Sequence, residues 1–168
     1  MLIWWQYTVT FVGSLIVALI SVWFSQWLSV RREYRKALEN LRSEVSTNID
    51  NIDLISRWID TNLDNLKENR VVVATCPHLY ESAWISVRGA VSSKDYDIAQ
   101  KMEGACGFLG SIHDLMHAVE ELKWGAGSAM TGSKQSKTTV FEAMKEIINK
   151  GLLPNLTEVK TLLDRKLG

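Results

Sequence analysis

Charged residues are missing from the first 30 positions of the chain, which contain no Asp, Glu, Lys or Arg. Four basic residues then follow within six positions: Arg31, Arg32, Arg35 and Lys36. A bilayer core of ~30 Å needs about 20 mostly apolar residues in a helix, and residues 8–28 meet that need. We therefore predict a transmembrane helix within residues 1–30.

The sequence also has few cysteines, few prolines and no net charge. Each of these features argues against a particular class of fold or binding site. Two cysteines, Cys76 and Cys106, are too few for a disulfide framework or a zinc site of the tetrahedral cysteine type. Two prolines and the lack of any long strand-like alternation predict an all-α protein. A net charge of zero argues against DNA or RNA duplex binding, which needs a basic surface.

The basic cluster sets the expected topology. Positively charged flanks stay in the cytoplasm, so we expect the amino terminus outside and residues 31–168 inside, in a cell inner membrane. A cleaved signal peptide is the alternative, but it would have a basic start, a shorter apolar run and a small-residue cleavage site. The expected protein is therefore single-pass.

One face of the predicted span carries small residues at helical spacing. They follow one another in steps of 4, 4, 3 and 4: Thr10, Ser14, Ala18, Ser21 and Ser25. Small residues let helices approach closely in lipid, and hydroxyls hydrogen-bond across such contacts. We predict a self-association face, with a pore as a further possibility. The alternative is that the hydroxyls bond only to their own backbone.

Residues 31–69 continue as a coiled-coil-like helix without Pro or Gly. Apolar residues recur every three or four positions over four heptads: Leu38, Leu41, Val45, Ile52, Ile55, Ile59 and Leu66. Asn48 and Asn62 occupy the two remaining positions of the series, where a buried Asn fixes register and strand number. The stripe is wider than a two-stranded seam, which favours a bundle of three or more helices.

The rest of the chain divides by composition. Residues 70–124 are predicted to form bundle helices at 77–89 and 94–124, with Ser92 and Ser93 opening the second. A Gly/Ser-rich linker is predicted at 125–138. Residues 139–168 are predicted to form a helical hairpin, in which Gly151 ends the first helix and Pro154 or Asn155 begins the second.

The predicted linker is the best candidate for a ligand site. Gly132, Ser133, Lys134 and Lys137 would offer backbone amides and two cations to an anion. The spacing departs from a phosphate loop because Ser133 precedes Lys134 and no strand comes before, so a nucleoside triphosphatase is not expected. A plain flexible linker is the alternative. His113, His117 and Glu120 share a helix face but are interpreted as surface residues, and neither a metal site, a cofactor nor a catalytic constellation is predicted.

Two short motifs carry a resemblance over residues 1–120. An L-x-x-E-[IV]-x-x-N signature occurs at Leu41 to Asn48, and an A-W pair follows at Ala83 and Trp84. Together with the span and its basic edge, they resemble a group of small prokaryotic membrane proteins with a cytosolic helical bundle. The layout is also similar to membrane effectors of type III CRISPR antiviral defence. That resemblance implies cyclic oligoadenylate as ligand and membrane perturbation as output.

We therefore expect a homo-oligomeric membrane sensor or effector. Its cytosolic bundle would bind a ligand, for which the resemblance implies a cyclic nucleotide second messenger, and would alter the membrane span. The alternative is a membrane scaffold or accessory subunit that binds a protein partner. An enzyme is not expected.

Overall fold

The computed structural model describes residues 2–68, 70, 78–124 and 130–168. Within these ranges every regular element is helical: α1 (Leu2–Lys67), α2 (Ser82–Lys94), α3 (Tyr96–Trp124), α4 (Met130–Ile147), the π-helical segment η1 (Ile148–Leu152) and α5 (Leu153–Leu167). The predicted all-α fold is confirmed. The chain divides into two compact units, Met1–Ala37 and Leu38–Gly168.

The first unit consists of the amino-terminal part of α1. From Phe11 onward this helix is long and apolar enough to cross a membrane, and the apolar stretch is not buried inside the protein. Near the end of the apolar run, Trp27 stacks on Phe24 with ring centroids 5.9 Å apart. The Arg31 guanidinium lies over the Trp27 ring at 5.4 Å. An aromatic residue beside the first cation is typical of a membrane–water interface.

The second unit is a helical bundle that contains the carboxyl-terminal half of α1. All seven apolar residues of the predicted seam are buried, and so are the two asparagines within it: Leu38, Leu41, Val45, Asn48, Ile52, Ile55, Ile59, Asn62 and Leu66. The periodicity is therefore confirmed as a core stripe. Other helices of the same chain pack on this stripe. For example, the half-buried Trp58 contacts Phe141 of α4 edge to face, with ring centroids 5.3 Å apart.

The helix boundaries between residues 78 and 124 differ from the prediction. α2 begins at Ser82, after non-helical residues 78–81, and runs on to Lys94. Ser93 does not cap the next helix, because its hydroxyl donates to the Ala90 carbonyl in the last turn of α2 at 2.9 Å. α3 begins instead at Tyr96, one residue after Asp95.

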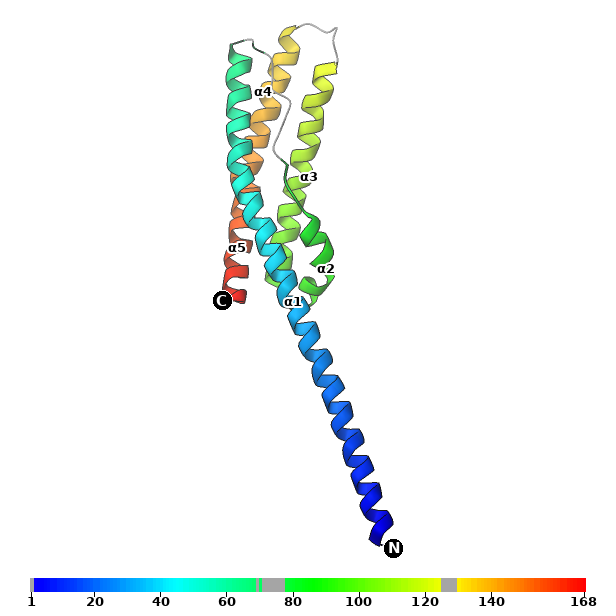
Figure 1. Ribbon diagram of the computed structural model, residues 1–168. Coiled ribbons are helices and arrows are strands. Elements are labelled where there is room, and N and C mark those ends of the chain that lie inside the picture. The colour runs from blue at the N-terminus through cyan, green and yellow to red at the C-terminus, as the bar shows by residue number, and fades with distance from the viewer. Residues whose placement is uncertain (1, 69, 71–77, 125–129) are drawn as a thin grey trace. The chain divides into compact units, whose positions relative to one another are not determined.

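The carboxyl-terminal helical hairpin predicted for 139–168 is not formed. α4, η1 and α5 follow one another without a turn, as Figure 1 shows, and the residues at both junctions have helical backbone angles. Gly151 lies inside η1 and is buried. Pro154, the second residue of α5, closely follows η1 and, because it has no N–H, cannot donate a helical hydrogen bond at this position.

Spacing of the buried residues accounts for the π-helical segment. Met144, Ile148, Leu152 and Leu156 are all buried and lie four residues apart. Three successive steps of four would rotate the stripe by about 120° around a regular α-helix of 3.6 residues per turn. The wider i→i+5 turn absorbs this rotation. Both α4 and α5 therefore face the same core.

Side-chain contacts give the order of packing within the bundle. α3 lies beside α2, α4, η1 and α5. On α1, Asp60 pairs with Lys145 of α4 at 2.6 Å, and Arg42 pairs with Asp164 of α5 at 2.5 Å. Lys166 of α5 pairs with Asp95 at the α2–α3 junction. One end of the bundle therefore brings together the start of its α1 portion, this junction and the chain's carboxyl end (Figure 1).

Candidate functional site

The predicted anion loop is helical where the structure describes it. Gly132, Ser133, Lys134 and Lys137 all lie in α4, which begins at Met130 rather than after residue 138. Residues 125–129 are outside the described ranges, as are the side chains of residues 130–134. A single Gly costs a helix about 1 kcal/mol, which the surrounding helix-compatible residues tolerate. Gly132 and Ser133 therefore lie in the first turn of α4 rather than in a loop, and an anion site at these residues stays a prediction.

The small-residue face of the span is described from Ser14 onward, while the Thr10 side chain lies outside the described part. Ser14, Ala18, Ser21 and Ser25 are exposed. The Ser14 hydroxyl donates to the Phe11 carbonyl and the Ser21 hydroxyl to the Val17 carbonyl, both at 2.8 Å. These two donors are satisfied within their own helix. Association through this face stays a prediction.

A row of polar side chains on α1 holds the chain that leads into α2. Asn48 is 2% exposed, and its amide Nδ2 donates to the Tyr80 carbonyl at 2.6 Å. The Tyr80 N–H donates back to Asn48 Oδ1 at 2.8 Å. One turn further, Asn51 Nδ2 donates to the His78 carbonyl at 2.8 Å. These bonds satisfy backbone groups that no helix or strand pairs. Asn48 thus fixes Tyr80, in the segment that leads into α2, against α1 of the same chain.

Glu44 belongs to the same row and caps α2 from outside. The residue at the N-cap position, Glu81, makes no capping bond with its own side chain. Instead the Glu44 carboxylate accepts the Ala83 N–H at 2.7 Å and the Trp84 N–H at 3.3 Å. A carboxylate at a helix amino terminus satisfies unpaired N–H groups and complements the helix dipole. We refer to Glu44, Asn48 and Asn51 as the polar ladder.

The polar ladder unites the two motifs noted in the sequence. Glu44 and Asn48 are the polar positions of the L-x-x-E-[IV]-x-x-N signature, and Ala83 and Trp84 are the A-W pair. Trp84 is 2% exposed and anchors α2 in the core. Because the signature's carboxylate binds the backbone of the pair, the two motifs form one structural device. An open cavity of about 350 Å³ lies beside it, lined by Asn40, Ser43, Glu44, Thr47, Tyr80, Ser82 and Ala83.

The surroundings of Cys106 and His113 indicate packing roles rather than chemical reactivity. Burial, together with the nearby carboxylates of Glu81, Glu103 and Glu44, raises the pKa of the Cys106 thiol to about 12. The thiol therefore stays protonated near neutral pH and is a poor nucleophile. The His113 ring stacks on His78 with centroids 6.2 Å apart. The Glu120 side chain lies outside the described part of the chain.

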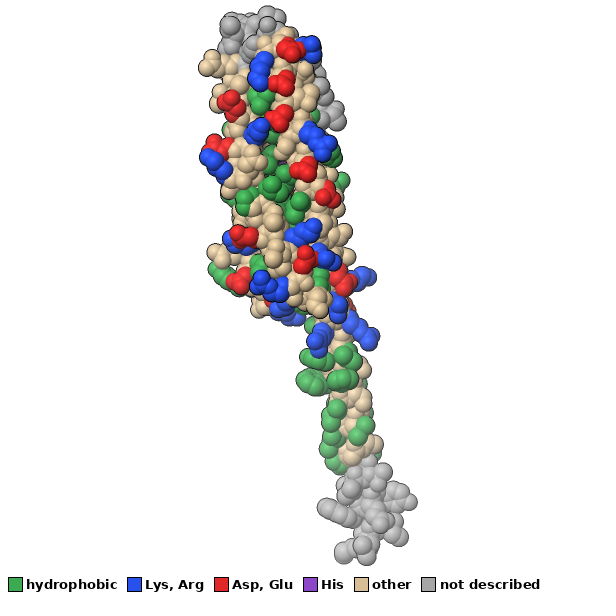
Figure 2. All heavy atoms as spheres, turned by 90° about the vertical axis from the view of Figure 1, so that its left-hand side faces the viewer, with side chains coloured by type: hydrophobic (Ala, Val, Ile, Leu, Met, Phe, Trp, Pro, Cys, Tyr) green, Lys and Arg blue, Asp and Glu red, His purple; other side chains and the backbone are tan. Residues whose placement is uncertain are grey.

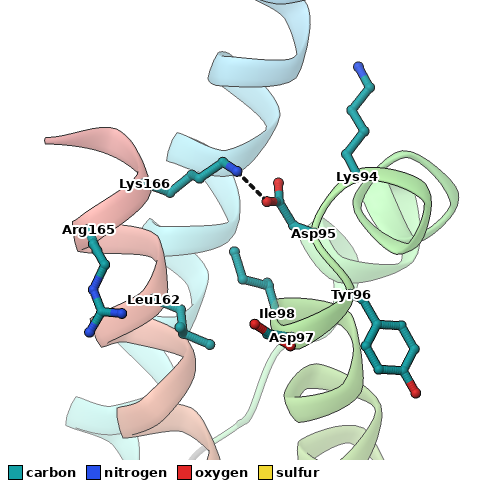
Figure 3. Close-up of a pocket in the computed structure, with 8 residues that line it drawn as sticks. All are labelled: Lys94, Asp95, Tyr96, Asp97, Ile98, Leu162, Arg165 and Lys166. Atoms are coloured by element: carbon teal, nitrogen blue, oxygen red, sulfur yellow. Dashed lines mark hydrogen bonds and ion pairs between the residues drawn. The ribbon is translucent and has the colours of Figure 1, made fainter.

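A groove lies between α3 and α5. Two adjoining cavities of about 300 and 390 Å³ share Asp97, Leu162 and Arg165. Figure 3 shows Leu162 and Ile98 directed toward one another from the two helices, with Lys166 paired to Asp95 above them. Lys101 and Glu158 form a second pair across the groove, at 2.6 Å. We call this feature the α3–α5 groove.

Comparison with known proteins gives no match: no family model, no curated protein and no solved structure is similar to this chain. The fold and the sites are therefore interpreted from the chain's own chemistry. The structure defines an all-α bundle whose first helix begins with a candidate membrane span.

Proposed function

We propose that this chain is a self-associating, single-pass membrane sensor or effector whose bundle responds to a ligand. One observation supports this more than any other. A single helix, α1, contains both the apolar stretch that begins the chain and the buried stripe of the bundle. The proposed topology places the amino terminus outside and the bundle in the cytoplasm, since the basic cluster at 31–36 follows the span.

The polar ladder supports a route from ligand to span. α2 is tied to α1 through Glu44, Asn48 and Asn51, so a ligand that displaces residues 78–84 changes what α1 packs against. Such a switch requires different ligand affinities in the two arrangements. In this proposal the helix passes the change to the face that carries Ser14, Ala18, Ser21 and Ser25.

Cyclic oligoadenylate, the ligand implied by the resemblance, is the first to test. The full chain in mild detergent is titrated with it, alongside a Lys134→Ala, Lys137→Ala double variant and a Lys160→Ala control. Weaker binding in the double variant alone supports a site at the start of α4. Equal binding by all three excludes these lysines, and no binding by the native chain excludes this ligand.

Crosslinking tests the membrane half of the proposal. Single cysteines at Ser14, Ala18, Ser21 and Ser25 are compared with cysteines at Ile16 and Ile20 on other faces, in a background without Cys76 and Cys106. Efficient disulfides at the small-residue face, with yields that change when ligand is added, are expected. Equal yields on all faces would refute association through this face.

A scaffold that binds a protein partner is the second candidate function. Bulky apolar side chains are exposed on the bundle, notably Ile85 at 65% and Leu54 at 47%. Figure 2 shows hydrophobic side chains exposed on one face of the bundle, and exposed apolar residues that gather in this way are typical of contact surfaces. This function predicts a stable heteromeric complex after purification in mild detergent, and no ligand-dependent toxicity in cells.

A further inference from the structure

We propose that the α3–α5 groove binds a phosphoethanolamine group, which carries a phosphate and a primary ammonium. The first argument is size. The two adjoining cavities, about 300 and 390 Å³, fall at the lower end of the range for small-molecule sites. Their shared residues make them one continuous groove that accommodates a headgroup of this kind.

The second argument is that the described part of the groove contains a cation and a carboxylate that are not used in ion pairs. Lys166 pairs with Asp95, and Lys101 pairs with Glu158. Among the residues that the structure describes, Arg165 and Asp97 have no hydrogen bond or ion pair, and neither does the Gln100 amide. Arg165 and Asp97 both line the groove, Arg165 from α5 and Asp97 from α3 (Figure 3). A cation and a carboxylate in one groove match a zwitterion better than a simple anion.

The chemistry of each group fits one end of this ligand. Arg165 presents a planar fork of donors suited to phosphate oxygens. Asp97 accepts hydrogen bonds from a primary ammonium, which has three N–H donors. A quaternary ammonium has no N–H and offers Asp97 only charge. Between them, the buried Ile98 and half-buried Leu162 form an apolar floor against which the short carbon linker packs.

Two sources could supply this group. A phospholipid headgroup is one, and a soluble phosphoethanolamine compound is the other.

The test uses the full chain in a phosphate-free maltoside detergent and follows glycerophosphoethanolamine by ³¹P NMR titration. Glycerophosphocholine, which lacks N–H donors, and glycerophosphoglycerol, which lacks the cation, are the comparison probes. We expect glycerophosphoethanolamine to bind at least about threefold more tightly than either. Arg165→Gln and Asp97→Asn should each weaken its binding about three- to tenfold.

Matched controls carry the same charge changes elsewhere on the bundle. Arg57→Gln and Asp53→Asn alter exposed residues of α1 and should leave binding unchanged. The four variant positions are all exposed, so the fold should be retained. Equal binding of the three probes, or equal weakening by the control variants, would overturn the proposal.

Nanodiscs separate the two sources. If phosphatidylethanolamine in a phosphatidylcholine disc displaces glycerophosphoethanolamine, the groove takes the lipid. If the probe binds the disc-embedded chain equally with and without that lipid, the groove takes a soluble compound. Only the lipid arm rests on the proposed membrane anchoring, and neither arm depends on crosslinking of the span. Failure here and failure of the proposed function are therefore distinguishable.

Discussion

Replacing Asn48 by Ala should loosen the start of α2 from α1. The Asn48 amide satisfies both the N–H and the carbonyl of Tyr80, at 2.8 and 2.6 Å. The variant leaves two part-buried backbone groups without their partner. An unsatisfied buried group costs about 1–3 kcal/mol. Because Tyr80 is 45% exposed, water reaches this segment, and the lower limit applies to each group. We expect a loss of about 2 kcal/mol.

Hydrogen exchange of the full chain in detergent measures this loss locally. If opening of residues 78–94 governs exchange, 2 kcal/mol corresponds to amide exchange about 30 times faster. Asn51→Ala is the matched control, since Asn51 makes a single exposed bond to the His78 carbonyl. That change should cost about 0.5 kcal/mol and speed exchange about twofold.

Two outcomes would refute the reasoning about Asn48. Equal acceleration by Asn48→Ala and Asn51→Ala would mean that burial of the Asn48 amide adds nothing. Acceleration spread evenly over α3 and α4 would mean that Asn48 supports the whole core rather than the entry to α2.

Three further predictions concern the bundle. Glu44→Gln should lower the free energy of unfolding by about 1 kcal/mol, because the amide keeps one acceptor but loses the charge at the start of α2. Thermal unfolding followed by near-ultraviolet circular dichroism measures this loss, and an unchanged midpoint would contradict the cap by Glu44. Gly151→Ala should destabilise by about 1–3 kcal/mol, because a Cβ there would lie 2.5 Å from the Phe108 ring. In contrast, Gly110→Ala should stabilise by up to about 1 kcal/mol, since nothing lies within 4 Å of that Cβ position; the same unfolding assay would contradict this pair if the two changes had equal effects. Burial raises the pKa of the Cys106 thiol from 9.0 to about 12, so its contribution to stability is full below pH 9 and is lost as pH rises toward 12; alkylation at pH 8 followed by mass spectrometry should be much slower in the folded chain than in urea, and equal rates would contradict the assigned burial.

Apolar periodicity made the fold class and the α1 stripe predictable. Leu38, Ile52 and Leu66 could be assigned to one face because α-helical geometry leaves little freedom in a long segment without Pro or Gly. The ends of the helices were harder to predict from the sequence. Ser93 has the chemistry of a cap, yet Val91, two residues before it, is buried in the core, and packing extended α2 past the serine.

The polar ladder could not be predicted because its partners are distant in sequence. The heptad position of Asn48 predicts that this residue fixes helix register, and the structure shows that its amide binds the Tyr80 backbone of the same chain, 32 residues away. A signal was nevertheless present. Glu44, Asn48 and Asn51 follow one another in steps of four and three, which puts their polar side chains on one helix face. The α3–α5 groove gave no such signal, since it depends on how two helices pack.

The π-helical segment has a consequence for changes in chain length. A π turn between two α-helices is equivalent to one extra residue inserted into a continuous helix. Removing one residue within Ile148–Leu152 would let an ordinary α-helix run through, and α5 would keep its face toward the core. The same deletion elsewhere in α4 or α5 would rotate every following side chain by about 100°. We therefore expect the bundle to tolerate a one-residue deletion within Ile148–Leu152 better than the same deletion elsewhere in α4 or α5.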